Sequence, residues 1–287
     1  MTARAAIDYA LWPALVAAPV AAAFGLLRAG AHPLLVTPLV VGPLTALLFV
    51  LERVRPEREP VPDRRFGLAR EAMHFLFDFE LGYGVALGVC EIVARLVRAH
   101  AAVPPWPSHW PLPLQVLVAT LVYEGTSYWQ HRALHRYSSL FRFHALHHAG
   151  ARLDFARAVR FHAVDIGTAS LVAYLPLVVL GAPDSLFAIL GVMLSALGLL
   201  QHANVRMRTP EWLDRIVCTP AVHRHHHSAR RVDSDTNFAN TLMLFDLVFG
   251  TYGKPLRPEG PPRIGLDDDP IPADFWGQLV GPFRSRR

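Results

Sequence analysis

Hydrophobic residues in this chain gather in long stretches, and most polar residues fall between them. A helix needs about 20 mainly apolar residues to cross the hydrocarbon core of a bilayer. Six stretches are close to that length and are predicted to be membrane spans: Tyr9–Leu27, Leu34–Leu51, Phe75–Val97, Leu112–Trp129, Val164–Leu180 and Ser185–Leu200. The pattern therefore predicts an all-α fold, an integral membrane helical bundle that crosses the bilayer several times.

The last two stretches are separated only by Gly181-Ala182-Pro183-Asp184. Glycine and proline interrupt helices and favour turns. We therefore expect Val164–Leu180 and Ser185–Leu200 to form a helical hairpin that crosses the membrane and returns.

Basic residues in the short connections predict which side of the membrane each loop occupies, because arginine is retained on the cytoplasmic side. The connection after the second stretch is rich in arginine: Arg53, Arg55, Arg58, Arg64, Arg65 and Arg70. Those after the first and third stretches have Arg28 and Arg98. Counting spans from the arginine-rich loop places residues 131–162, and the chain from Arg206 onward, in the cytoplasm. A bacterial inner membrane is the expected location.

Composition agrees with a single membrane domain, since 52% of the residues are hydrophobic and only 18% are charged. The net charge of +5 comes almost entirely from arginine, because Lys254 is the one lysine. The arginines do not form a stripe interleaved with aromatic residues, which argues against nucleic acid as a partner. Cys90 and Cys218 are isolated and form neither a disulfide framework nor a thiolate metal motif. Any metal site must therefore rely on histidine.

Eleven of the fifteen histidines lie between residues 131 and 227. They form the clusters His131-Arg-Ala-Leu-His135, His144-Ala-Leu-His147-His148 and His223-Arg-His-His226-His227, with His162 and His202 at the two ends of the hairpin. Helical residues three or four apart share a face, so their rings can converge on one point. Gathering buried imidazoles without a ligand would cost roughly 1 to 3 kcal/mol for each unsatisfied nitrogen. The clusters therefore predict a metal site in a histidine-rich cap.

The number of histidines indicates more than one ion. Imidazole suits zinc, copper, iron and nickel, and a zinc site usually takes four ligands. Ten candidate ligands are too many for one ion, and a two-metal centre beside a membrane favours oxygen activation over hydrolysis. A membrane zinc hydrolase stays open as an alternative. A metal transporter is a weaker one, because its histidines should lie at mid-bilayer instead of at span ends.

The motifs around these histidines carry a family resemblance. Their order and spacing resemble those of the fatty acid hydroxylase and sterol desaturase superfamily over residues 117–252. The matching stretches are Glu124–His135, Phe143–His148, Arg160–His162, His202–Asn204, Thr219–Ser228, Asp235–Asn237 and Leu244–Tyr252. The resemblance implies a cytoplasm-facing centre of two iron ions, with O2 as co-substrate and a separate electron-donor protein. The implied reaction is hydroxylation or desaturation of a lipid, such as a fatty acyl chain or a sterol-like molecule.

Carried over position by position, the resemblance implies a set of metal ligands: His131, His135, His144, His147, His148, His162, His202, His223, His226 and His227. His225 is expected to lie behind the ligands or at the surface. Metal-bound imidazoles usually donate their other N–H to a carboxylate or carbonyl, and Glu124, Asp165, Asp235 and Asn237 are the candidates to accept. The chain is expected to divide into membrane helices and linkers at 1–112, a catalytic region at 113–252 and a proline-rich tail at 253–287.

Overall fold

The computed structural model describes residues 3–59, 67–100, 105–257, 260–268 and 271–284, and within these ranges helices and loops make up the fold with no named strand. The long helices are α1 (Ala3–Arg28), α2 (Pro33–Val54), α4 (Glu80–His100), α5 (Leu112–Arg136), α7 (Ala163–Leu180) and α8 (Asp184–His202). The shorter ones are α3 (Leu68–Met73), α6 (Ser138–His148), α9 (Pro220–His226), α10 (Arg231–Ser234), α11 (Leu244–Val248) and α12 (Phe275–Val280). The all-α prediction is confirmed.

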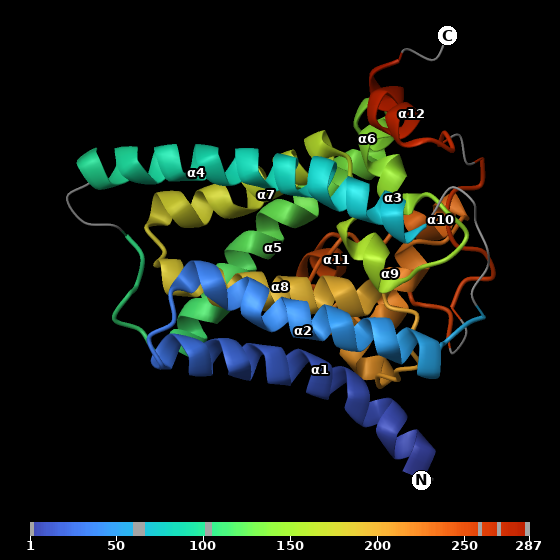
Figure 1. Ribbon diagram of the computed structural model, residues 1–287, viewed down its shortest axis with the longest axis horizontal. Helices are drawn as coiled ribbons and strands as arrows, with labels where there is room; N and C mark the ends of the chain where they lie inside the picture. The colour runs from blue at the N-terminus through green and yellow to red at the C-terminus, as the bar shows by residue number, and fades with distance from the viewer. Residues whose placement is uncertain (1–2, 60–66, 101–104, 258–259, 269–270, 285–287) are drawn as a thin grey trace.

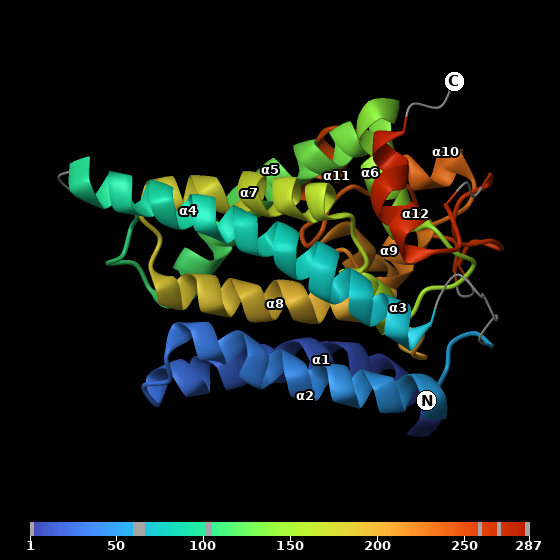
Figure 2. The ribbon, with the colours of Figure 1, turned by 45° about the horizontal axis from the view of Figure 1, so that its top comes forward.

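Helices α1, α2, α4, α7 and α8 form layers that run roughly alongside one another, and α5 crosses between them obliquely (Figure 1, Figure 2). Helices α1 and α2 pack on α8, and α4 packs on α7, while α5 contacts both α7 and α8. Buried leucines such as Leu44, Leu48 and Leu200 fill the interface between α1, α2 and α8. Helix α8 is therefore the central element, and its C-terminal end points toward the short helices.

Four helices are long and apolar enough to cross a bilayer, namely α1 from Arg4, α2, α7 and α8. The stretches 75–97 and 112–129 are helical as expected, but α4 and α5 are not among these four helices. In α4, the charged residues Glu91, Arg95 and Arg98 lower the apolar character. Four of the six predicted spans are thus confirmed as long, apolar helices within the described residues. The four spans form two hairpins, α1–α2 and α7–α8. Each hairpin crosses the membrane and returns, so its two ends stay on one side even if α4 and α5 are not spans.

The turn between α7 and α8 is built as the sequence predicts. Gly181 has φ 77°, a left-handed conformation that glycine adopts without strain. Its N–H donates to the Val178 carbonyl, and the Ala182 N–H donates to the Leu177 carbonyl at 3.0 Å. The hairpin returns the chain to the end of the bundle where the short helices lie.

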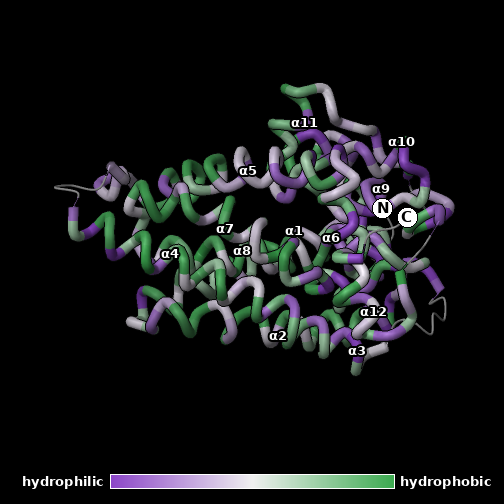
Figure 3. Tube along the Cα trace, turned by 90° about the horizontal axis from the view of Figure 1, so that it is seen from above, coloured by the Kyte–Doolittle hydropathy of each residue, from purple (hydrophilic) through white to green (hydrophobic). Residues whose placement is uncertain are grey.

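The short helices and the C-terminal segment form a polar cap at one end of the apolar bundle (Figure 3). The described part of the segment after residue 252 is more than a tail, because it packs back on the cap. Arg257 binds Asp214, and Gln278 on α12 contacts His74 across 2.6 Å. The C-terminal segment is therefore held both on the cap and on the chain between α3 and α4.

Candidate metal centre

Nine histidines converge in the cap as two separate groups. In each group, one ring nitrogen from every histidine lies within 4.8 Å of those from the others, and every member is buried. We call the first group cluster A, which consists of His131, His135, His144, His148 and His226. We call the second cluster B, which consists of His147, His202, His223 and His227. Helices α5, α6, α8 and α9, with His227 directly after α9, supply these side chains, so neither cluster exists until the four helices pack.

The outward-facing Nδ1 atoms of four of these histidines lie against backbone carbonyl oxygens. The Nδ1–H groups of His131 and His226 donate to the carbonyls of Phe238 and Thr236, each at 2.8 Å. In cluster B, His202 donates to Gly198 at 2.8 Å and His147 to Arg160 at 3.2 Å. A carbonyl can only accept, so these contacts place the proton on Nδ1 and leave a lone pair on Nε2.

Two carboxylates face the Nδ1 atoms of two further histidines in cluster A. Nδ1 of His144 lies 2.8 Å from the buried Asp165 carboxylate, and Nδ1 of His135 lies 3.3 Å from that of Asp235, which is half-exposed. A carboxylate partner makes the imidazole a stronger ligand and fixes its orientation. Two of the four residues expected to accept from the candidate ligands, Asp165 and Asp235, thus lie within hydrogen-bond distance of one.

The inner Nε2 atoms face one another at distances that fit metal ligation. The Nε2 atoms of His131 and His144 lie 3.1 Å apart, and those of His147 and His202 lie 3.3 Å apart. In all four rings the proton is on Nδ1, so these Nε2 atoms face one another with lone pairs. Nε2 of His226 is buried with no hydrogen-bond partner in the described part of the chain. Two nitrogens about 2.1 Å from one ion would be separated by about 3.0 Å at a 90° angle and about 3.4 Å at a tetrahedral angle. A cation in each cluster would turn these repelling lone pairs into ligands.

The protonation of the cap histidines also suits metal binding. Burial, followed by the neighbouring imidazoles, lowers the pKa of His147, His148, His223 and His227 well below the usual value. Burial lowers the pKa of His226 to about 3. The rings are therefore neutral near pH 7, which is the form that coordinates metals.

His162 lies outside both clusters. Its Nδ1 accepts a hydrogen bond from the Val164 N–H at 3.1 Å at the start of α7, and its Nε2 lies 3.0 Å from the Leu279 carbonyl. Both nitrogens are thus engaged in holding α7 and the C-terminal segment. His225 also lies outside the clusters and is buried, so its expected place behind the ligands fits better than the surface.

Glu124 and Asn237 shape the loop beside cluster A instead of contacting a ligand. The Glu124 carboxylate accepts from the backbone N–H groups of Asn240, Thr241 and Leu242 at 2.6 to 3.0 Å. Asn237, at φ 58°, exchanges two hydrogen bonds with the backbone of Gly253. These contacts hold the segment 236–242, which supplies two of the carbonyls that accept from the histidines.

Asp246 is a supporting residue that the sequence reasoning missed. Its carboxylate accepts from the N–H groups of Phe238 and Ala239 at 2.9 and 2.8 Å, and Thr251 Oγ1 donates to it at 2.6 Å. It therefore fixes the Phe238 carbonyl on which His131 depends. The signal that could have found it is its place in the matching stretch Leu244–Tyr252.

Fold and site together define a class of protein: an all-α membrane protein whose polar cap gathers histidines in groups able to hold metal. Residues 116–251 match the family model described as fatty acid hydroxylase. The ornithine lipid hydroxylase OlsE of Rhizobium tropici is 32% identical over 97% of this chain and 85% of its own length. The chain therefore belongs to the fatty acid hydroxylase and sterol desaturase superfamily, and the resemblance seen in its motifs is confirmed.

Other relatives match about half of the chain. The alkylglycerol monooxygenases of Danio rerio and Homo sapiens are each 30% identical over 52% of this chain and 32% of their own length. No solved structure matches the chain. Its relatives are enzymes that oxidise lipids, and this chain is accordingly a membrane oxidoreductase that acts on a lipid.

Proposed function

We propose that this protein is an oxygen-dependent di-iron hydroxylase of a membrane lipid, with its active site on the cytoplasmic side. One observation carries the proposal: in both cluster A and cluster B, Nε2 atoms with lone pairs face one another. Cluster A offers five imidazoles and cluster B four, and acceptors hold the outer Nδ1–H groups of several of them, such as those of His131, His144 and His202. This arrangement suits one metal ion per cluster.

Iron is the metal that fits both the donor set and the relatives. Imidazole binds zinc, copper and iron alike, so the ligands by themselves do not choose between them. The relatives are named for hydroxylation and monooxygenation, which require redox chemistry that zinc does not provide. Two iron ions, when bound, would supply the oxygen activation needed to attack an unactivated C–H bond.

The chain's own residues have the remaining tasks. Asp165 and Asp235 would orient His144 and His135, and Asp246 would hold the loop whose carbonyl accepts from His131. Apolar helices next to the cap would bring the lipid chain to the site and limit the access of water. Electrons would come from a separate donor protein that docks on the cytoplasmic face.

The substrate proposed first is an ornithine lipid or a related amino-acid lipid. This follows from the similarity to the ornithine lipid hydroxylase, which extends over nearly the whole chain, whereas the similarity to the alkylglycerol monooxygenases covers half. The names of both groups favour hydroxylation over desaturation.

The test is expression in bacteria that make ornithine lipid, grown under 18O2 or 16O2, with lipid extracts analysed by mass spectrometry. We expect a new lipid that gains one oxygen atom, labelled under 18O2. His147→Ala should abolish the product, whereas His162→Ala should retain it, because His162 lies outside both clusters.

An unlabelled product formed without oxygen would contradict the oxygenase and favour a zinc hydrolase. Product formation by His147→Ala at the wild-type level would contradict the assignment of cluster B. The content of iron and zinc in both purified variants, read by plasma mass spectrometry, separates loss of metal from loss of folding.

A further inference from the structure

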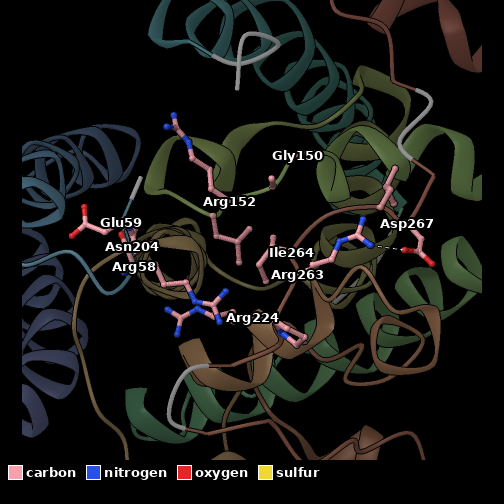
Figure 4. Close-up of a pocket in the computed structure, with 13 residues that line it drawn as sticks. Arg58, Glu59, Gly150, Arg152, Asn204, Arg224, Arg263, Ile264 and Asp267 are labelled. Atoms are coloured by element: carbon pink, nitrogen blue, oxygen red, sulfur yellow. Dashed lines mark hydrogen bonds and ion pairs between the residues drawn. The ribbon is translucent and has the colours of Figure 1, made fainter. Parts of the chain in front are cut away.

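Two adjoining cavities lie in the cap outside the histidine clusters. The first, of about 430 Å³, is lined by the chain just beyond α2, the loop after α6, Asn204 after α8, helix α9 and the segment 262–267 (Figure 4). The second, of about 330 Å³, lies between the start of α1, residues 207–211 and α9. Arg224 on α9 lines both cavities and so joins them.

Arginine is the dominant charged residue around these cavities. Arg58, Arg152, Arg224 and Arg263 line the first together with Glu59 and Asp267, and Arg208, Arg224 and Arg257 line the second with Glu211. Most of these arginines have a carboxylate close by. Arg263 pairs with Asp267, Arg152 with Asp154, Arg208 with Glu57, and Arg257 with Asp214.

Arg224 is the least compensated of the set. Only 10% of its side chain is exposed, and its one carboxylate neighbour in the described chain is Glu57, at 4.0 Å, too far for a hydrogen bond. Glu57 is already bound to Arg208 at 2.7 Å. A buried guanidinium without hydrogen bonds is costly. Arginine keeps its positive charge at neutral pH, so this position is cationic.

The position of the cavities indicates where an anion would come from. Tyr9, near the start of α1, lines the second cavity, and Asn204, two residues beyond the end of α8, lines the first. These are the cap-side ends of two helices that are long and apolar enough to cross the bilayer. A group bound there lies at the level of lipid headgroups, which favours a lipid over a freely diffusing anion.

We propose that the two cavities joined at Arg224 bind the anionic group, a carboxylate or a phosphate, of a lipid headgroup. Arg224 would donate to it in the forked geometry that guanidinium groups offer such anions. Arg224 also separates His223 from His225 in the third histidine motif, so the headgroup would be held beside cluster B. The proposal rests on the proposed function in that the bound lipid is taken to be the substrate.

Binding is tested on the full-length protein in a neutral maltoside detergent by isothermal titration calorimetry. The probes are N-decanoylglycine, which carries a carboxylate and an acyl chain, and its neutral amide, N-decanoylglycinamide. Inorganic phosphate and acetate serve as anions without a chain. We expect N-decanoylglycine to bind more tightly than all three.

The variants locate the site. Arg224→Gln should weaken N-decanoylglycine binding roughly tenfold, the loss expected from one charged hydrogen bond, and Arg224→Lys should be intermediate. Arg95→Gln, an exposed arginine on α4 that pairs with Glu91, is the control and should bind like the wild type. If Arg224→Gln does not fold, as judged by its circular dichroism, Arg58→Gln tests the same cavity.

Equal binding of the acid and the amide would overturn the proposal, as would unchanged binding by a folded Arg224→Gln. Phosphate or acetate that binds as tightly as N-decanoylglycine and displaces it would assign the cavities to a soluble anion and exclude the lipid. The titration needs neither oxygen nor reductant. Absence of probe binding would therefore overturn the headgroup site and leave the hydroxylase proposal intact. A protein that binds the probe but forms no hydroxylated lipid would contradict the hydroxylase proposal and leave the headgroup site intact.

Discussion

Oδ2 of Asp165 lies 2.8 Å from Nδ1 of His144, and both side chains are buried. The contact joins the first turn of α7 to α6, and His144 belongs to cluster A. Asp235 makes the equivalent contact with His135, but at 3.3 Å and with its side chain 39% exposed. The same chemical relationship thus occurs twice near one cluster, once buried and once in contact with solvent.

The difference between the two aspartates predicts a graded effect. Asp165→Asn should lower metal affinity and product formation by roughly 10- to 100-fold, the usual loss when a partner of a metal-bound histidine is removed. Asp235→Asn is the matched control and should have a smaller effect, because solvent screens its longer contact. Metal content after dialysis against graded chelator measures both. Equal losses in the two variants would contradict the argument.

Glu124 should matter for folding more than its distance from the ligands suggests. Glu124→Gln keeps one acceptor oxygen but sets an amide NH2 group against the backbone N–H groups of residues 240–242. We expect the free energy of unfolding to fall by about 2 to 3 kcal/mol, as for lost hydrogen bonds to a buried charge. Denaturant titration in detergent measures this change. Glu91→Gln, on the exposed face of α4, should leave stability nearly unchanged.

Acid should destabilise the metal-free protein. His147, His148, His223, His226 and His227 have folded-state pKa values below the usual 6.5, and that of His226 is about 3. Below pH 6.5 the unfolded chain binds more protons than the folded one, so stability falls as the pH falls from about 6.5 toward 3. Thermal melts of chelator-treated protein between pH 8 and pH 5 test this. A melting temperature that rises toward pH 5 would contradict it.

Helices α4 and α7 pack too closely for a side chain at one position. A Cβ at Gly82 would overlap the Ala163 carbonyl oxygen and come within 2.7 Å of Ile166 Cγ2. Gly82→Ala should therefore destabilise the protein by about 1 to 3 kcal/mol. Gly84→Ala on the same helix meets nothing within 4 Å and should be neutral or stabilising by up to about 1 kcal/mol. Thermal melts of both variants in one detergent make the comparison.

The sequence by itself determined the class of protein and most of the site's inventory. Apolar stretches long enough to span a bilayer are a local property, and so is the spacing that puts His131 and His135 on one helical face. The turn at Gly181 and the ordered motifs of the superfamily are local in the same sense. For this reason the all-α membrane fold, the α7–α8 hairpin and the family were predicted correctly without contacts between distant residues.

Only the tertiary structure decided how the histidines divide. His147 and His148 are adjacent in the chain but belong to different clusters, because successive helical residues point in different directions toward different neighbouring helices. His162 lies outside both clusters, where its ring contacts the start of α7 and the C-terminal segment. The carbonyl that fixes His131 belongs to Phe238, 107 residues away. Backbone carbonyls have no sequence signature, so the packing of α5, α6, α8 and α9 was required to reveal them.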